Sequence, residues 1–219
     1  MKIFIVIPAY NESRRIGKVL VDLAKYKLPI IVVDDGSNDD TSLIAANLKA
    51  TVLRHRVNLG KGAALKTGFK SALKNGADAV IMIDADGQHK TSDLPEFLKV
   101  LKSGEYEVLL GVRILKNKVP AVRLMGNKLA SFLVWLLFGI KVSDMLCGYR
   151  ALTTKALKKM KLDSVGYGIE TEMIVEIAKR SLKYCEVPVT TIYYDKAKGV
   201  TILDAINILF DVVIWRIAK

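Results

Sequence analysis

The sequence predicts an α/β fold in which a mostly parallel central sheet is flanked by helices. Five short apolar runs alternate with helical stretches between residues 3 and 110, and this order is typical of a parallel sheet. The runs are apolar at consecutive positions rather than at alternate ones, as in strands that are covered on both faces. Polar and acidic clusters directly follow three of the runs.

The predicted strands are continuous runs of aliphatic and β-branched residues that end at turn-forming or charged residues. The first run stops at Pro8, the second at Asp34-Asp35-Gly36-Ser37, and the fourth at Asp84-Ala85-Asp86. The expected strands cover residues 3–7, 30–33, 51–53, 79–83 and 108–110.

The segments between these strands are predicted to be helices because their apolar residues recur at helical spacing. In the first of them, Ile16, Val19 and Leu23 fall on one helical face. The other helices of this half are expected to begin near residue 39 and to cover residues 62–73 and 93–101.

The second half of the sequence is less regular. It predicts a hydrophobic helix at 122–138, a helix at 167–179, a strand at 183–194 around Pro188, and a C-terminal amphipathic helix that starts at Ile202. No internal repeat, low-complexity tract or linker interrupts the sequence. We therefore expect a single domain over residues 1–219.

Composition limits the classes of protein that remain. A chain of 219 residues, 51% of them hydrophobic, buries roughly 70% of its unfolded surface and needs no disulfide framework. Its two cysteines, Cys147 and Cys185, indicate a reducing, cytoplasmic setting. The 34 basic and 22 acidic residues give a net charge of +12, which attracts phosphorylated ligands, anionic lipid or nucleic acid. The sequence shows no signal peptide, and its longest apolar run, residues 129–140, is shorter than the ~20 residues that span a bilayer.

The polar clusters at the strand ends predict a metal and phosphate site. Ligands of such sheets bind at the carboxyl ends of the strands, so Tyr10-Asn11-Glu12, Asp34-Asp35 and Asp84-Ala85-Asp86 are expected to converge. Two carboxylates that are two residues apart on an extended segment can approach one divalent cation. Gln88 can add an amide oxygen, and Mg²⁺ prefers such a set completed by water and substrate phosphates.

Five segments, in this order, resemble motifs of the nucleotide-sugar-binding domain of glycosyltransferase family 2. They are residues 7–12, 34–41, 58–64, 84–89 and 143–151. The Asp-Ala-Asp-Gly-Gln-His form and the last segment look most like the dolichol-phosphate mannosyltransferase branch, whose acceptor is a polyprenyl phosphate. The resemblance implies a single-domain GT-A type fold. Residues 1–111 would form its nucleotide-sugar and metal-binding half, and residues 112–219 its acceptor-binding half, which includes the C-terminal helix.

The resemblance also assigns the donor site. It implies that Asp84, Asp86 and Gln88 hold Mg²⁺ or Mn²⁺ against the diphosphate, with Asp86 as a catalytic residue, and that Asp35 reads a base edge. The implied reaction is inverting transfer of mannose or glucose from GDP-mannose or UDP-glucose to dolichyl or polyprenyl phosphate. The full set of implied nucleotide-sugar contacts is Pro8, Tyr10, Glu12, Val33, Asp35, Asp84, Ala85 and Asp86.

A lipid phosphate acceptor needs cations rather than a general base, because a phosphomonoester with a second pKa of ~6 is already ionised near neutral pH. Arg113 and Arg123 match arginines that contact phosphate in the lipid-phosphate branch, and Arg113 is the second catalytic candidate. Arg150 is a further acceptor candidate, although an ion pair with Asp144 explains it equally well. Lys198 is the last, in a basic segment whose register departs from the family's phosphate-closing loop.

Several other residues have a structural interpretation beside a functional one. The Gly60-Lys61-Gly62 segment fits a turn into a helix, or a contact to phosphate or base at that helix start. Glu170 and Glu172 suit the first turn of a helix, with a catalytic role as the alternative. His55 is expected to be a strand-end residue.

The lipid acceptor, the charge of +12 and the apolar stretches at 129–140 and 202–217 predict a peripheral protein at the cytoplasmic face of a membrane. A membrane-anchoring partner subunit is a further expected partner. The alternatives are transfer to a lipid or glycan hydroxyl, an inactive nucleotide-sugar sensor, and a basic nucleic-acid-binding protein. Scattered cations and 7% aromatic residues argue against nucleic acid. A dinucleotide dehydrogenase is excluded, since no Gly-x-Gly-x-x-Gly follows the first strand.

Overall fold

The computed structural model describes residues 1–114, 121–192 and 202–217. Its strands are β1 (Ile3–Ala9), β2 (Ile30–Asp34), β3 (Thr51–Arg54), β4 (Ala79–Met82), β5 (Val108–Ile114), β6 (Arg150–Thr153) and β7 (Tyr184–Thr190). Its α-helices are α1 (Ser13–Ala24), α2 (Thr41–Asn47), α3 (Lys61–Lys74), α4 (Leu94–Ser103), α5 (Ala121–Phe138), α6 (Thr154–Lys159), α7 (Ile169–Lys179) and α8 (Ile202–Ile217). A 3₁₀ turn, Thr91–Asp93, precedes α4.

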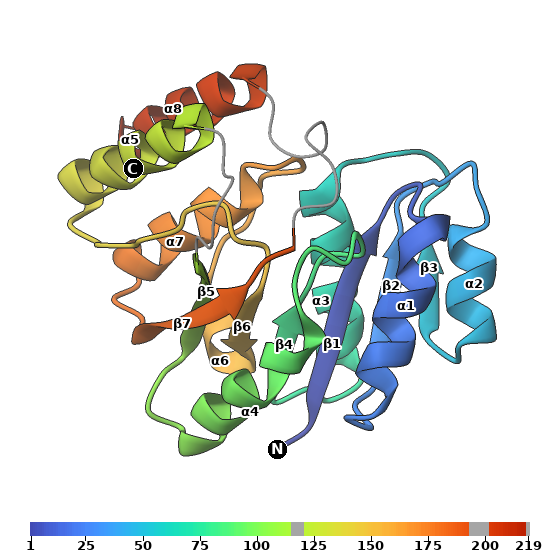
Figure 1. Cartoon of the computed structure of the whole chain (residues 1–219). Helices are drawn as coiled ribbons and strands as arrows, with labels where there is room; N and C mark the ends of the chain where they lie inside the picture. The colour runs from blue at the N-terminus through green and yellow to red at the C-terminus, as the bar shows by residue number, and fades with distance from the viewer. Residues whose placement is uncertain (115–120, 193–201, 218–219) are drawn as a thin grey trace.

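The strands form one sheet in the order β3-β2-β1-β4-β6-β5-β7 (Figure 1). All neighbouring pairs are parallel except those of β6, which runs antiparallel between β4 and β5. Strands from both halves of the chain therefore belong to a single sheet, and the predicted α/β class is confirmed.

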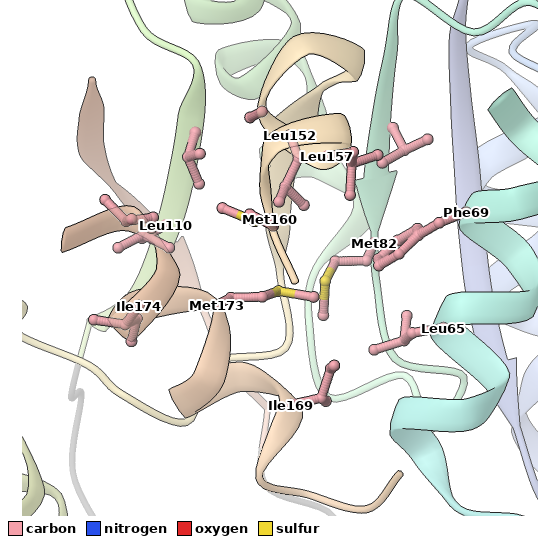
Figure 2. Close-up of a cluster of buried hydrophobic side chains, with 14 of the residues drawn as sticks. Leu65, Phe69, Met82, Leu110, Leu152, Leu157, Met160, Ile169, Met173 and Ile174 are labelled. Carbon is pink, nitrogen blue, oxygen red and sulfur yellow. The ribbon is translucent and has the colours of Figure 1, made fainter. Parts of the chain in front are cut away.

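Side chains alternate between two cores on opposite faces of the sheet, as the period of a strand requires. Phe4 and Val6 of β1 pack with α3 and α7 on one face, whereas Ile5 and Ile7 pack with α1 and α4 on the other. Figure 2 shows Met82 of β4 pointing into the first core, near Leu65 of α3 and Met173 of α7. Covering both faces leaves the ends of the strands as the place for a polar site.

Helices α5 and α8 pack together at the opposite end of the molecule from α1 and α2 (Figure 1). Val134 of α5 and Val212 of α8 are buried in the core beneath them. None of the helices in the described residues combines the length and the hydropathy that a transmembrane span requires.

All five strands predicted in the first half are present, and the differences lie at their ends. β1 continues through Pro8 to Ala9, beyond the β1–β4 ladder, whose register ends at the Val6–Met82 pair. The prediction missed β6 and α6, which follow one another directly. β6 has only four residues and opens on an arginine, so neither an apolar run nor a turn marked it in the sequence.

Candidate functional site

The loops that follow β1 and β2 are joined by hydrogen bonds at the carboxyl edge of the sheet. The backbone N–H of Asn11 donates to Ser37 Oγ at 2.9 Å, and that of Glu12 donates to Thr41 Oγ1 at 2.9 Å. In return, Asn38 N–H donates to Asn11 Oδ1 at 2.9 Å. Asn11 has a φ of 54°, a left-handed conformation that asparagine tolerates better than most residues. The first two polar clusters therefore form one structural unit.

Asp35 is a buried anchor between the end of β2 and the start of α3. Its carboxylate accepts hydrogen bonds from the N–H groups of Leu59 at 3.0 Å and Gly60 at 2.7 Å, and from His55 Nδ1 at 2.7 Å. The other ring nitrogen of His55 lies 2.9 Å from Thr67 Oγ1. His55 thus holds Asp35 in place, which is more than the strand-end role expected of it.

Asp84 and Asp86 follow β4 and share one electrostatic environment. Burial and the charge of Asp84 raise the pKa of Asp86 to about 6, and the charge of Glu12 adds to this effect. The backbone N–H of Gln88 donates to Asp86 Oδ1 at 2.9 Å, which fixes that carboxylate. Glu12 thus belongs to the same site as Asp86, and the predicted convergence of the clusters after β1, β2 and β4 is confirmed.

Gly148, from the last motif segment, makes room for Asp84. A Cβ atom on Gly148 would lie only 2.2 Å from Asp84 Oδ2 and 2.7 Å from its Cγ. Real side chains do not approach this closely, so any residue larger than glycine displaces the carboxylate. The absence of a side chain at Gly148 therefore allows the loop before β6 to pack directly against Asp84 at the end of β4.

These residues fit a divalent cation that is bound together with a phosphate ligand. Burial and, after it, the charge of Asp84 make the ionised form of Asp86 unfavourable, and a bound cation would stabilise that form. In the described part of the chain, no group of three or more acidic, histidine or cysteine side chains is arranged to hold a metal. Asp84, Asp86 and Gln88 would therefore need phosphate or water oxygens to complete an octahedral shell.

Lys61 and Glu170 belong to the same site, although sequence patterns had allowed a structural as well as a functional role for each. Lys61 Nζ lies 2.6 Å from Asp84 Oδ1 and 2.6 Å from Glu170 Oε1. Burial alone lowers the pKa of Lys61, but the charges of Asp84 and Glu170 outweigh it and hold this pKa above its usual value. A lysine between two glycines was the only sequence signal, and nothing in the sequence paired it with α7.

A cavity of about 450 Å³ opens beside Asp86 and His89, along one side of α1. Most of the charged side chains around it are basic, which suits a ligand that carries phosphate. No sequence pattern had marked these residues as a group. The basic residues that line the cavity are Arg14, Arg15, Lys18, Lys25 and Lys90.

Arg113 at the end of β5 forms a two-pronged ion pair with Asp144. Its Nε lies 2.6 Å from Asp144 Oδ2 and its Nη2 lies 2.8 Å from Oδ1. Burial alone would raise the pKa of Asp144, but the hydrogen bonds and charge of Arg113 keep it below its ordinary value. The partner of Asp144 is therefore Arg113, and the expected pair with Arg150 is wrong.

Arg150 is a structural residue, so its assignment to the acceptor phosphate is also wrong. It is fully buried, and its guanidinium donates to the carbonyl oxygens of Cys147 at 3.0 Å, Glu170 at 2.5 Å and Met145 at 2.7 Å. These bonds fasten the motif loop before β6 to the first turn of α7. A phosphate has no access to this side chain.

Replacing Arg150 with methionine is expected to lower the free energy of unfolding by about 2–4 kcal/mol, because three buried carbonyl groups lose their donors. The measurement is denaturant unfolding of the variant, with Arg14→Met, which removes an exposed arginine from α1, as the control. Equal stability of the two variants would contradict the structural role.

The remaining predicted residues differ in accessibility. Val33 is wholly buried, packed beneath Gly68, so the expected contact with the nucleotide is wrong. Ala85 is almost as inaccessible, with only 3% of its surface exposed. Pro8 is half-buried and Tyr10 is exposed at the sheet edge, where a ligand can reach them. The side chain of Arg123, in α5, and the whole of Lys198 lie outside the described residues.

Comparison with known proteins places this chain among glycosyltransferases. The model of the family described as glycosyl transferase family 2 matches residues 4–161. A UDP-N-acetylglucosamine–dolichyl-phosphate N-acetylglucosaminyltransferase of Methanococcus voltae is 32% identical, over 99% of this chain and 97% of the relative. The polyprenol monophosphomannose synthase of Mycolicibacterium smegmatis is 29% identical, over 97% of this chain and 86% of the relative.

The fold is similar to that of a solved structure as well. Glucosyl-3-phosphoglycerate synthase from Mycobacterium tuberculosis, in complex with Mn²⁺, UDP-glucose and phosphoglyceric acid, superposes with a TM-score of 0.79. The match covers 99% of this chain and 80% of that one, at 22% sequence identity. At this identity, the likeness supports the GT-A architecture alone.

Proposed function

The chain belongs to glycosyl transferase family 2, and on this premise we propose that it transfers a hexose, mannose or glucose, from a nucleotide sugar to dolichyl or polyprenyl phosphate. The observation that carries the proposal is the convergence of Glu12, Asp84 and Asp86 at the carboxyl edge of the sheet. Of two relatives that match nearly the whole chain, one is named as a dolichyl-phosphate N-acetylglucosaminyltransferase and the other as a polyprenol monophosphomannose synthase.

The donor binds at this edge of the sheet. Asp84, Asp86 and Gln88 would hold Mg²⁺ or Mn²⁺, which supplies charge neutralisation for the departing nucleoside diphosphate. The accessible Tyr10 and the half-buried Pro8 offer surfaces for the base and ribose. Asp35 contributes by holding Leu59 and Gly60 in place. Its carboxylate already accepts three hydrogen bonds, and any contact to a base edge would be an additional one.

The acceptor phosphate binds near Arg113, whose guanidinium is held in one orientation by Asp144. Guanidinium groups suit phosphate oxygens because they present several donors in a fixed plane. Arg123 and Lys198 are further proposed contacts to this phosphate. In this arrangement residues 1–111 supply the donor site and residues 112–219 the acceptor site, on one continuous sheet.

Replacing Arg113 or Arg123 with alanine is expected to lower kcat/KM for a short polyprenyl phosphate by about 10- to 100-fold, while nucleotide affinity changes little, because a charge-assisted bond to phosphate is lost. Steady-state kinetics and nucleotide titration measure the two quantities. Because Arg113 also pairs with Asp144, Asp144→Asn and thermal unfolding separate lost phosphate contact from lost structure. Equal losses in nucleotide affinity would place both arginines in the donor site instead.

The surface of α5 and α8 supports action at a membrane. Large apolar side chains of both helices are exposed, and helices of this kind lie in the interface of a bilayer. The net charge of +12 favours an anionic lipid surface. The exposed residues are Leu129, Phe132, Trp135 and Leu136 of α5, and Phe210, Val213, Ile214 and Ile217 of α8.

The test of the proposed function is a calorimetric titration of GDP-mannose, UDP-glucose and UDP-N-acetylglucosamine, first with Mn²⁺ and then with EDTA. We expect one hexose donor to bind in a metal-dependent way and a short polyprenyl phosphate then to be glycosylated. Metal-dependent binding of UDP-N-acetylglucosamine alone would replace the hexose with an N-acetylhexosamine. Binding of no donor, in the presence or absence of the lipid phosphate, would overturn the proposal.

A further inference from the structure

The ammonium group of Lys61 occupies the position next to Asp84 that a metal ion would need. It is 2.6 Å from Asp84 Oδ1, and its side chain is 16% exposed. A divalent cation bound through this oxygen would lie about 2.1 Å from it, within a few ångström of the ammonium. Two cations at that separation in a poorly solvated site repel each other strongly. Metal and ammonium therefore compete for the same carboxylate.

Glu170 gives the ammonium a second, permanent partner. One oxygen of this carboxylate lies 2.6 Å from Lys61 Nζ. The other is buried and has no hydrogen-bond partner within the part of the chain that the structure describes. Glu170 is only 3% exposed, so its charge is compensated inside the protein, by Lys61 in direct contact and by the nearby guanidinium of Arg150. The ammonium can therefore leave Asp84 without leaving the site.

The backbone around this pair is built to keep it together. A Cβ atom on Gly62 would lie 2.4 Å from the carbonyl oxygen of Ser164, so the start of α3 is pressed against the loop before α7. Glu172 holds the same loop by accepting the N–H groups of Asp163 at 2.9 Å and Ser164 at 3.0 Å. The start of α3, which carries Lys61, is thus held next to α7, which carries Glu170.

We propose that Lys61, retained by Glu170, shields Asp84 from free divalent ions and makes metal binding depend on the diphosphate of the donor. The inference rests on the proposed function, since it assumes the donor and metal site described above. A diphosphate brings anionic oxygens that bind the metal and also accept hydrogen bonds from the ammonium once it leaves Asp84. Lys61 is accordingly a residue that determines specificity for a metal–nucleotide complex over the metal alone.

The test is a titration with Mn²⁺, first without nucleotide and then with GDP or UDP. The electron paramagnetic resonance signal of free Mn²⁺ measures how much of the ion is bound. The deciding variant is Lys61→Gln/Glu170→Gln, which removes one positive and one negative charge and leaves the net charge of the site unchanged. We expect it to bind Mn²⁺ at least about tenfold more tightly than the wild type without nucleotide, because Asp84 is no longer occupied. The increase in Mn²⁺ affinity that GDP or UDP causes should be correspondingly smaller in this variant than in the wild type.

The controls separate this inference from simpler explanations. Lys61→Gln alone should bind Mn²⁺ more tightly still in the absence of nucleotide, and Lys70→Gln, which changes an exposed lysine on the same helix, should match the wild type. If the charge-balanced double variant binds Mn²⁺ like the wild type, net charge alone explains Lys61 and the inference fails. If the wild type binds no Mn²⁺ even with either diphosphate, the proposed metal site fails, and the inference falls with it.

Discussion

Replacing Asp86 with asparagine is expected to reduce kcat for sugar transfer by about two to three orders of magnitude, because the metal that neutralises the leaving diphosphate loses one of its carboxylates. The protein should nevertheless fold. The Oδ1 atom of asparagine can still accept the hydrogen bond from the Gln88 N–H that now reaches Asp86. Steady-state turnover at saturating donor and several Mn²⁺ concentrations measures the loss.

The stability of this variant is expected to equal or exceed that of the wild type at neutral pH. The pKa of Asp86 is raised from 3.8 to about 6 by burial and by the charge of Asp84. Because this carboxyl group binds its proton more tightly in the folded state, it lowers the free energy of unfolding as the pH rises from about 4 to about 6. At pH 7 the whole of this destabilisation is present. Asparagine carries no charge and removes the penalty.

A matched control is Glu96→Gln, which neutralises an exposed carboxylate on α4 and should leave both turnover and stability unchanged. Near-wild-type turnover of Asp86→Asn at saturating Mn²⁺ would show that this carboxylate is not a metal ligand. Loss of folding in the variant would show instead that the charge of Asp86 supports the structure.

The sequence could predict the sheet and the location of the site because both depend on local patterns. A buried parallel strand is a continuous apolar run, and its carboxyl end is marked by the first polar residues after it. Asp84 and Asp86 were found in this way, as were Glu12 and Asp35. The strongest predictions thus concern residues whose role follows from their place along one strand.

The errors concern contacts between distant segments. The spacing of Arg150 allowed either an ion pair or a phosphate contact, and only the packing of α7 shows that its guanidinium donates to backbone carbonyls. The pairing of Lys61 with Glu170 was invisible for the same reason, because it joins α3 to α7 through tertiary structure. Val33 was misassigned because a strand residue that precedes a motif can face the core instead of the ligand.

Gly148 provides the second large effect, because it acts on the same site without contributing a side chain. Gly148→Ala places a methyl group 2.2 Å from Asp84 Oδ2 and 2.8 Å from Oδ1. Asp84 has to rotate away, which breaks its contact with Lys61 and moves it from its place beside Asp86. We expect turnover and diphosphate-dependent Mn²⁺ binding to fall by about 100-fold, with a loss of about 1–3 kcal/mol in the free energy of unfolding.

The comparison that isolates this mechanism is Gly126→Ala in α5, where a new Cβ meets nothing within 4 Å and alanine favours the helix by about 1 kcal/mol. That variant should keep full activity and gain stability. If Gly148→Ala instead unfolds the protein, the clash is with the packing as a whole rather than with one carboxylate. If it binds Mn²⁺ and turns over like the wild type, Asp84 tolerates the displacement. Its Oδ2 atom, which lies next to Gly148, would then contribute nothing to the metal site.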